Sequence, residues 1–239
     1  MAYQDYPKGE LWNTNLTAND STAQETLGAI RELNDGRAFR YVKITGGTCA
    51  LGQVNTIASA TAITNLTSAD GTGPDGATTT IITDSDASWT TNAYVGYYYQ
   101  TTTGGTGSTE PIKIVANTAT TLTLEKSIAT GLASGATDDG EIVAPLAVAA
   151  IAAANEQGQP VSGVGIGTIT QNYYGWTQIR GYAAVLGDTL TEGESICPGG
   201  NANGQAIVAD DDADNTIIGY VVAASGNDEC NFCCLTIAA

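Results

Sequence analysis

Apolar and polar residues alternate along much of this chain, and a period of two is typical of β-strands with one buried face. The pattern is most regular in 171–190, where Trp176 and Tyr182 fall on one face of an extended chain and Ile179 falls on the other. The run before it, 161–167, alternates glycine with valine and isoleucine. We expect the two stretches to pair as a hairpin whose glycine-lined face receives both aromatic rings. Trp176 and Tyr182 are therefore the expected core anchors.

Further strands follow from the same alternation and from the turn residues between the apolar runs. The expected strands are 39–44, 49–57, 79–84, 94–101, 112–115, 121–124, 216–224 and 232–237. The run 216–224 is nearly all apolar, which predicts a central strand buried on both faces.

Helix is favoured in 145–157, which has Pro145 near its first turn, many alanines, and Gly158 after its end. A second short helix is compatible with 22–33, whose leucine and isoleucine residues form a stripe at helical spacing.

The composition changes along the chain and suggests two β-rich domains. Residues 1–38 are polar and irregular and predict an N-terminal arm that packs either on its own barrel or on a neighbouring subunit, with Tyr3, Tyr6 and Trp12 as candidate interface residues. Residues 39–76 and 145–239 are expected to form one discontinuous β-barrel or sandwich domain. Residues 77–144 are expected to form a small β-domain inserted into it. The predicted fold class is mainly β, with one short helix and an extended N-terminal arm.

Charge and residue usage exclude several functions. The chain has 8 basic and 25 acidic residues, for a net charge of −17, which repels phosphate backbones and opposes nucleic acid as a partner. It has no histidine, which removes Ser-His-Asp and Cys-His catalysis and the zinc sites that use histidine. Enzymes built on paired carboxylates survive this test. We expect no catalysis and no cofactor.

Two clusters imitate metal sites. Cys230, Cys233 and Cys234 form a Cys-x-x-Cys-Cys run that only Cys49 and Cys197 could complete. Cysteine in a strand more often acts as a small buried apolar residue, so we expect thiols and no metal.

Alternate acids at Asp210, Asp212 and Asp214 resemble the start of a calcium loop. The later positions of that pattern do not fit, since Asn215 stands where glycine is needed, and a solvated acidic turn is the simpler reading.

Two further features of the sequence bear on where the protein is made and whether it crosses a membrane. The first residues have neither a basic stretch nor an apolar one of the kind that directs export, so synthesis in a cytoplasm is expected. The longest nearly apolar run, 142–154, is interrupted by Pro145 and is too short to cross a bilayer. No membrane partner is expected.

Three segments resemble virion structural proteins of tailed phages. The run 174–178, Tyr-Gly-Trp-Thr-Gln, followed by a small apolar stretch and Gly-Asp-Thr-Leu at 187–190, resembles the core of small β-rich capsid decoration or cement proteins. The run 36–54 is similar to strands of the same family, and 84–124 is similar to a β-module of many phage virion proteins.

The resemblance implies a structural protein that binds and stabilises the phage head shell. Its implied partner is the major capsid protein, and its implied state is a homo-oligomer, a trimer or a dimer, on the capsid surface after assembly in the host cytoplasm. An alternative is a receptor- or glycan-binding module of a tail or head fibre, with a sugar platform at Tyr94, Tyr97, Tyr98 and Tyr99. A carboxylate-based glycan hydrolase is less favoured, because no spacing identifies a pair of acids.

Overall fold

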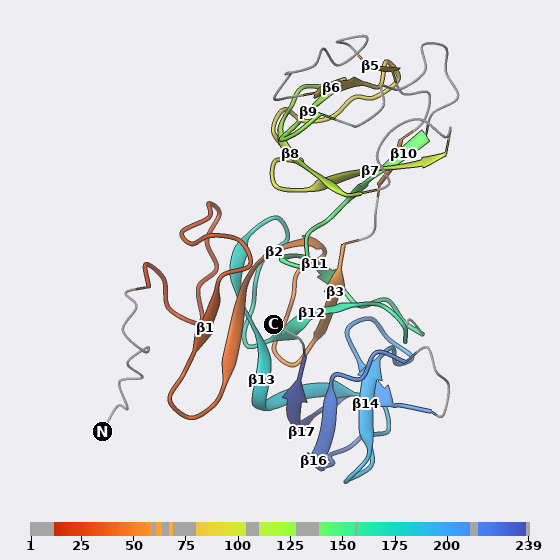
Figure 1. Ribbon diagram of the computed structural model, residues 1–239. Helices are drawn as coiled ribbons and strands as arrows, with labels where there is room; N and C mark the ends of the chain where they lie inside the picture. The colour runs from red at the N-terminus through yellow and green to blue at the C-terminus, as the bar shows by residue number, and fades with distance from the viewer. Residues whose placement is uncertain are drawn as a thin grey trace. The chain divides into compact units, whose positions relative to one another are not determined.

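The computed structural model describes residues 12–58, 61–63, 67–68, 80–103, 110–127, 139–155, 157–210 and 215–237. This part of the chain is all β and contains no helix. It divides into two compact units (Figure 1). Unit 1 joins the chain up to Ala58 with the chain from Leu146 onward, and unit 2 is formed within Ser59–Pro145.

Strand pairing in unit 1 closes a first ring of hydrogen-bonded strands. In order around the ring, β2 pairs with β11, β11 with β3, β3 with β12, β12 with β13, and β13 with β2 again. The bounds are Ala38–Gly46 for β2, Val148–Ile151 for β11, Val54–Ile57 for β3, Val161–Gly165 for β12 and Tyr174–Gly187 for β13.

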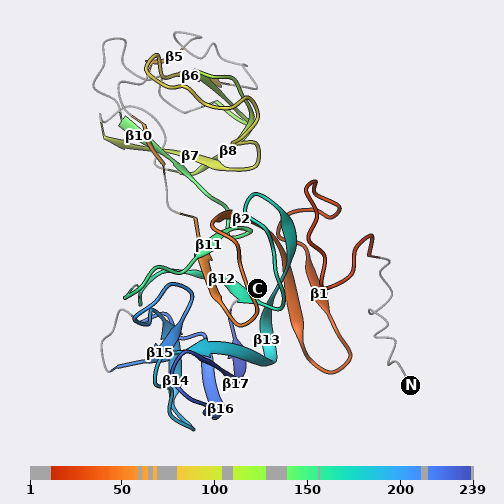
Figure 2. The same ribbon diagram turned by 180° about the vertical axis from the view of Figure 1, so that it is seen from behind.

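A second ring in unit 1 shares the strand β13 with the first. Here β13 pairs with β15, β15 with β14, β14 with β16, β16 with β17, and β17 with β13 (Figure 2). The bounds are Ala206–Val208 for β15, Ser195–Pro198 for β14, Gly219–Ala223 for β16 and Glu229–Thr236 for β17.

The 14 residues of β13 are long enough to serve both rings. Its first half pairs with β2 and β12, and its second half, from Arg180 to Gly187, pairs with β17. The change occurs at Gly181, whose φ of +85° lies in the left-handed region that favours glycine. A Cβ atom there would lie 3.1 Å from the Arg37 Cα atom, so glycine also allows a close approach of the two backbones.

Alternate residues of β13 line the interiors of the two rings. Ala183 and Val185 belong to the largest apolar core, which lies mainly inside the second ring.

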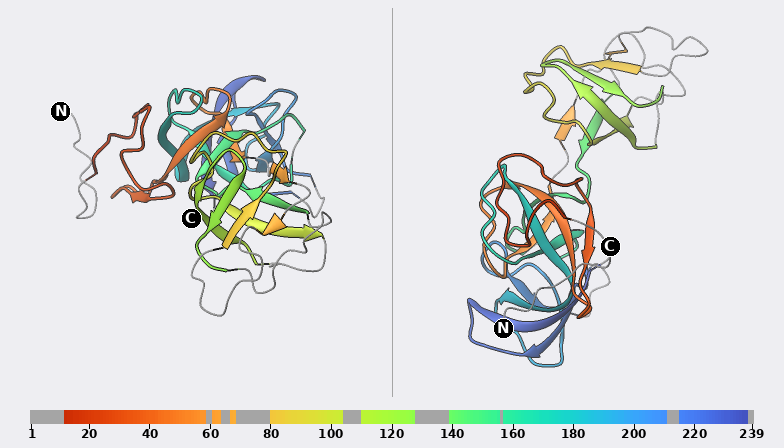
Figure 3. Two further views of the ribbon diagram at one scale, coloured as in Figure 1. Left: turned by 90° about the horizontal axis from the view of Figure 1, so that it is seen from above. Right: turned by 90° about the vertical axis from the view of Figure 1, so that its left-hand side faces the viewer.

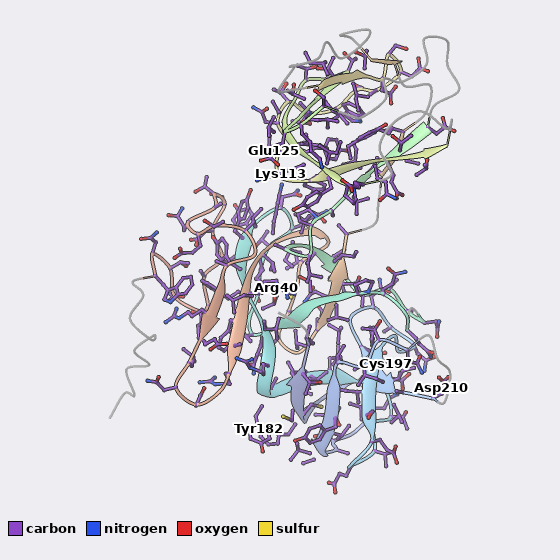
Figure 4. The ribbon with its side chains drawn as sticks, viewed as in Figure 1. Arg40, Lys113, Glu125, Tyr182, Cys197 and Asp210 are labelled. Carbon is purple, nitrogen blue, oxygen red and sulfur yellow. The ribbon has the colours of Figure 1, made fainter. Side chains whose placement is uncertain are left out.

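The first ring also holds polar groups in its interior. Arg40, only 2% exposed, donates from Nη1 to the carbonyl oxygen of Ser162 at 2.8 Å, and burial lowers the pKa of its guanidinium. Figure 4 shows Arg40 among the strands of unit 1.

The helix expected in 145–157 is absent, and β11 forms there instead. Ala149 pairs with Ile44 of β2 on one side and with Ile57 of β3 on the other. Alanine favours helix only weakly, and hydrogen bonds to two neighbouring strands outweigh that preference. Likewise, 22–33 forms turns and the short strand β1 (Ile30–Glu32), which pairs with the start of β2.

Unit 2 is one sheet in the order β4, β10, β7, β8, β9, β6, β5. The bounds are Thr61–Ile63 for β4, Asp139–Val143 for β10, Tyr98–Thr103 for β7, Ile112–Asn117 for β8, Thr121–Leu124 for β9, Thr80–Thr83 for β6 and Thr67–Ser68 for β5. It has its own apolar core, with Tyr99 and Ile142 among its fully buried side chains.

The boundary of unit 2 differs from the expected one. The unit starts at Ser59 rather than at residue 77, because β4 pairs with β10 and β5 pairs with β6. In unit 1, Ile57 lies opposite Ala149, and the Ala58 amide donates to the Val148 carbonyl oxygen at 2.9 Å. The chain therefore leaves and re-enters unit 1 at neighbouring positions of a hairpin between β3 and β11.

Candidate interaction surface

The outward side chains at the start of β13 are covered by the N-terminal segment, which we define as residues 12–29. Trp12 meets Trp176 edge to face, with ring centroids 5.0 Å apart and an interplanar angle of 87°. Trp176 also meets Tyr41 at 5.1 Å, and Tyr41 stacks on Tyr174 at 6.4 Å. Trp176 is consequently only 1% exposed.

A cation closes this aromatic column at each end. Arg31 lies 6.0 Å from the centroid of the Trp12 ring, and the Lys43 ammonium lies 5.9 Å from that of Tyr174. Backbone hydrogen bonds also hold the N-terminal segment to β13. The Asp20 amide donates to the Tyr174 carbonyl oxygen at 3.0 Å, and the Tyr174 amide donates to the Asp20 carbonyl oxygen at 2.8 Å. The segment, in red, runs along β2 in the views of Figure 3.

The expected interface residues thus fall in different places. Trp12 packs within its own chain, so it is not a free contact residue of an arm. Tyr3 and Tyr6 lie outside the described residues.

The glycines of β12 do not receive Trp176 as expected. A Cβ atom on Gly163 would lie 2.4 Å from the Thr177 Oγ1 atom, and one on Gly165 would lie 2.2 Å from the Ala50 carbonyl oxygen. These glycines therefore admit Thr177 and a neighbouring turn. Trp176 is on the opposite side of β13 from Thr177, so it faces the N-terminal segment.

Four large outward side chains of the second ring are exposed to solvent. We call Tyr182 of β13, Tyr220 and Val222 of β16, and Phe232 of β17 the aromatic face. They are 56%, 43%, 38% and 46% exposed, respectively. The rings of Tyr182 and Phe232 stack at 5.1 Å with an interplanar angle of 19°. Single exposed apolar residues are common, whereas a contiguous apolar group on three neighbouring strands makes this face a candidate contact surface.

Strand register brings this face together. Tyr182 lies opposite Cys234, which lies opposite Tyr220, and Ala184 lies opposite Phe232. Hydrogen bonding to Cys234 raises the pKa of the Tyr220 hydroxyl. Figure 4 places Tyr182 beside β17, at the border of unit 1.

Tyr182 was expected in the core, and its exposure corrects that expectation. Its neighbour across the strand pair is the small Cys234, and the N-terminal segment packs on Trp176 and Tyr174 instead. The run 216–224 likewise predicted a strand buried on both faces. In β16, Val221 is buried, whereas Tyr220 and Val222 point outward, because a ring strand has one inner and one outer face.

The aromatic face has little charge. Among the exposed residues of β13, β16 and β17, all of which the structure describes, only Arg180 and Glu229 are charged, and Arg180 pairs with Glu32. Acidic residues elsewhere give the chain its net charge of −17.

The five cysteines are thiols that do not converge. Cys233 points into the second ring, whereas Cys230 and Cys234 point outward on the same strand. Cys49 and Cys197 are buried in other strands and turns. Burial raises the pKa of Cys49, Cys197 and Cys233 to about 11 in each case. Within the described ranges, no three side chains of the metal-binding types come together.

The acidic run around Asp210 lies partly outside the described residues. Asp210 accepts a hydrogen bond from the Asn215 side-chain amide, and Asp212 and Asp214 fall in the range 211–214, which is not described.

The four tyrosines considered as a sugar platform do not share a face. Tyr99 is fully buried in unit 2, and Tyr98, 37% exposed, points to the opposite side of β7. Tyr94 and Tyr97 are half-buried against the core of unit 2, in a ladder of edge-to-face contacts with Trp89. Their rings serve mainly to pack unit 2.

In the ranges that the structure covers, no helix has the length and apolar character needed to cross a membrane. Comparisons with protein-family models, with curated proteins and with solved structures find no match to this chain.

Proposed function

We propose that this chain is a structural protein of a tailed-phage virion, a decoration or cement protein that binds the head shell and stabilises it. Its proposed partner is the major capsid protein, and its proposed location is the capsid surface. Unit 1 would be the barrel domain of this protein and unit 2 its inserted β-domain.

The observation that carries the proposal is the aromatic face, an exposed apolar surface of unit 1 that suits contacts between the copies that decorate a shell. A cement protein acts through contact area, and aromatic side chains dominate the energetics of protein contacts. Tyr182, Tyr220 and Phe232 are held on a rigid ring of strands, so they lose little conformational freedom when a partner covers them.

The resemblance to decoration proteins falls on the strand that organises unit 1. The motif 174–178 forms the first half of β13, and the following small apolar run forms its second half. The residues that carry the resemblance are thus the ones that join the two rings.

The N-terminal segment suggests how the shell is engaged. Trp12 is held on unit 1 by its contacts with Trp176 and Arg31. We propose that Tyr3 and Tyr6 contact the shell and that Trp12 attaches the N-terminal residues to the first ring. Many weak contacts of this kind add up over a symmetric lattice.

Quantitative mass spectrometry of purified particles tests this function. A copy number close to that of the major capsid protein or a simple fraction of it supports a decoration protein. A few copies per particle would favour a fibre component instead, and absence from particles would exclude both.

The proposed contact can be tested on the same particles. Recombinant wild-type protein should bind shells that lack it, and Tyr3→Ala with Tyr6→Ala should bind at least about tenfold more weakly. Val115→Thr, at an exposed position of unit 2, is the matched control and should bind like the wild type.

A further inference from the structure

We propose that the aromatic face is a self-association surface, through which two copies of this chain form a two-fold symmetric dimer. The inference goes beyond the role in the virion, because it concerns the free protein in solution and names the surface and the symmetry.

Charge favours a second copy as the partner. Each copy has a net charge of −17, so two copies repel each other over most of their surfaces. The exposed residues of β13, β16 and β17 include only two charged side chains, Arg180, which is paired with Glu32, and Glu229 at the first position of β17. The aromatic side chains themselves are uncharged, so an acidic chain meets less repulsion at this face than at its acidic surfaces.

The arrangement of large and small side chains is self-complementary. Tyr182 and Phe232 occupy one diagonal of a square of four outward positions, and Cys234 and Ala184 occupy the other. A two-fold axis that is parallel to the sheet and runs along or across the strands places the large residues of one copy over the small residues of its partner. Sheets that pack face to face in this way interlock their side chains about 10 Å apart.

The symmetry follows from the use of a single face. A surface that binds an identical surface is related to it by a two-fold axis, whereas a trimer needs two different patches on each copy. One aromatic face on unit 1 therefore fits a dimer.

Sedimentation velocity of the full chain measures the association, with a reducing agent present so that disulfides do not contribute. Between about 1 and 100 µM, the wild type should pass from monomer to dimer with a Kd of about 10 µM. The double variant Tyr182→Thr with Phe232→Thr should raise the dimer Kd by at least about 30-fold, because both anchors are lost. Threonine keeps the preference for strand at exposed positions.

A matched control separates the face from general effects of removing apolar surface. Val115 and Ile81, 40% and 37% exposed, are strand residues of unit 2. Val115→Thr with Ile81→Thr should change the dimer Kd by less than about twofold. Far-UV circular dichroism should show that both double variants keep the wild-type fold.

Two natural thiols report which surface is covered. Cys230 is exposed and Cys234 is half-buried, and both point outward on β17. Their rates of reaction with a small maleimide, followed by mass spectrometry, should fall as the wild-type concentration rises through the dimer Kd. In the Tyr182→Thr, Phe232→Thr variant these rates should not depend on concentration.

Three outcomes overturn the proposal. They are a monomer at every concentration, a dimer that keeps its Kd in the Tyr182→Thr, Phe232→Thr variant, and thiols whose protection does not change with concentration. A monomer whose thiols become protected only on added shells would assign the face to the capsid protein instead. Because sedimentation and thiol reactivity of the free protein need no particles, their failure is distinct from failure of the decoration function.

Discussion

The two halves of β13 present outward side chains of the same kind to different surroundings. In the first half, Trp176 is 1% exposed, because the N-terminal segment packs on it. In the second half, Tyr182 is 56% exposed, although it points to the same side of the same strand. An aromatic residue at an outward position is therefore structural when another segment of the chain covers it, and available for a partner when none does.

The comparison also shows what covers each face. Asp20 and Trp12, which lie more than a hundred residues before β13 in sequence, help to cover the outward side chains at the start of β13. The second ring also has aromatic residues on its outer side, and in our proposal a second copy of the chain covers them.

The largest expected effect comes from a matched pair of substitutions. Trp176→Ala should lower the free energy of unfolding of unit 1 by about 3 to 5 kcal/mol, because it empties a fully buried site. Tyr182→Ala should lower that of the monomer by less than about 1 kcal/mol. Urea unfolding followed by far-UV circular dichroism measures both, at a concentration where the protein is monomeric. Equal losses in the two variants would show that the faces do not differ.

Removal of the covering residue is the next largest change. Trp12→Ala should lower the free energy of unfolding of unit 1 by about 2 kcal/mol, roughly half the effect of Trp176→Ala, because Trp12 is only half-buried. It should also increase binding of an apolar dye such as ANS, because Trp176 becomes accessible. Wild-type stability and dye binding in this variant would mean that the N-terminal segment does not cover the first ring.

Excision of unit 2 should leave both faces unchanged. Residues 59–145 can be replaced by an Asn-Gly turn, because Ile57 and Ala149 already lie opposite each other in a strand pair. We expect the free energy of unfolding of unit 1 to change by less than about 1 kcal/mol, and Trp176 to remain protected from fluorescence quenchers. Loss of β structure in the shortened chain would contradict the division into two units.

The smallest effect is a dependence of stability on alkaline pH. Cys49, Cys197 and Cys233 have pKa values raised from 9.0 to about 11 by burial, so the unfolded chain loses these protons first. The unfolded state then binds fewer protons than the folded state, and the free energy of unfolding should fall as pH rises from about 9 to about 11. Urea titrations across this range measure the slope. A variant with alanine at all three positions should show a shallower fall, and an unchanged slope would mean that these thiols are not buried.

The alternation of side chains predicted much of the fold. It located β13 and its antiparallel partner β12, as well as four strands of unit 2, β6 to β9, but it did not locate β4, β5 or β10. It could not show that the two halves of β13 belong to different rings, because strand pairing depends on residues far apart in sequence. The alanine-rich stretch around Ala149 misled the prediction, since helix propensity is weaker than the hydrogen bonds that two neighbouring strands supply.

The candidate site was harder to predict than the fold. The pattern placed Trp176 and Tyr182 on one face, which is correct for the strand itself. Periodicity does not reveal which part of a face another segment will cover, and so Tyr182 was assigned to the core. Tyr220 and Phe232 were missed as surface residues, although their alternation with Val221 and Cys233 contained that signal.

A density map of intact virus particles that contain this protein tests the central claim most directly. We expect unit 1 on the outside of the head shell, with residues 1–11 against capsid subunits and the aromatic face of each copy against that of a neighbouring copy. Protein found only at the tail or in a fibre would contradict the decoration function, and an aromatic face open to solvent would contradict the dimer.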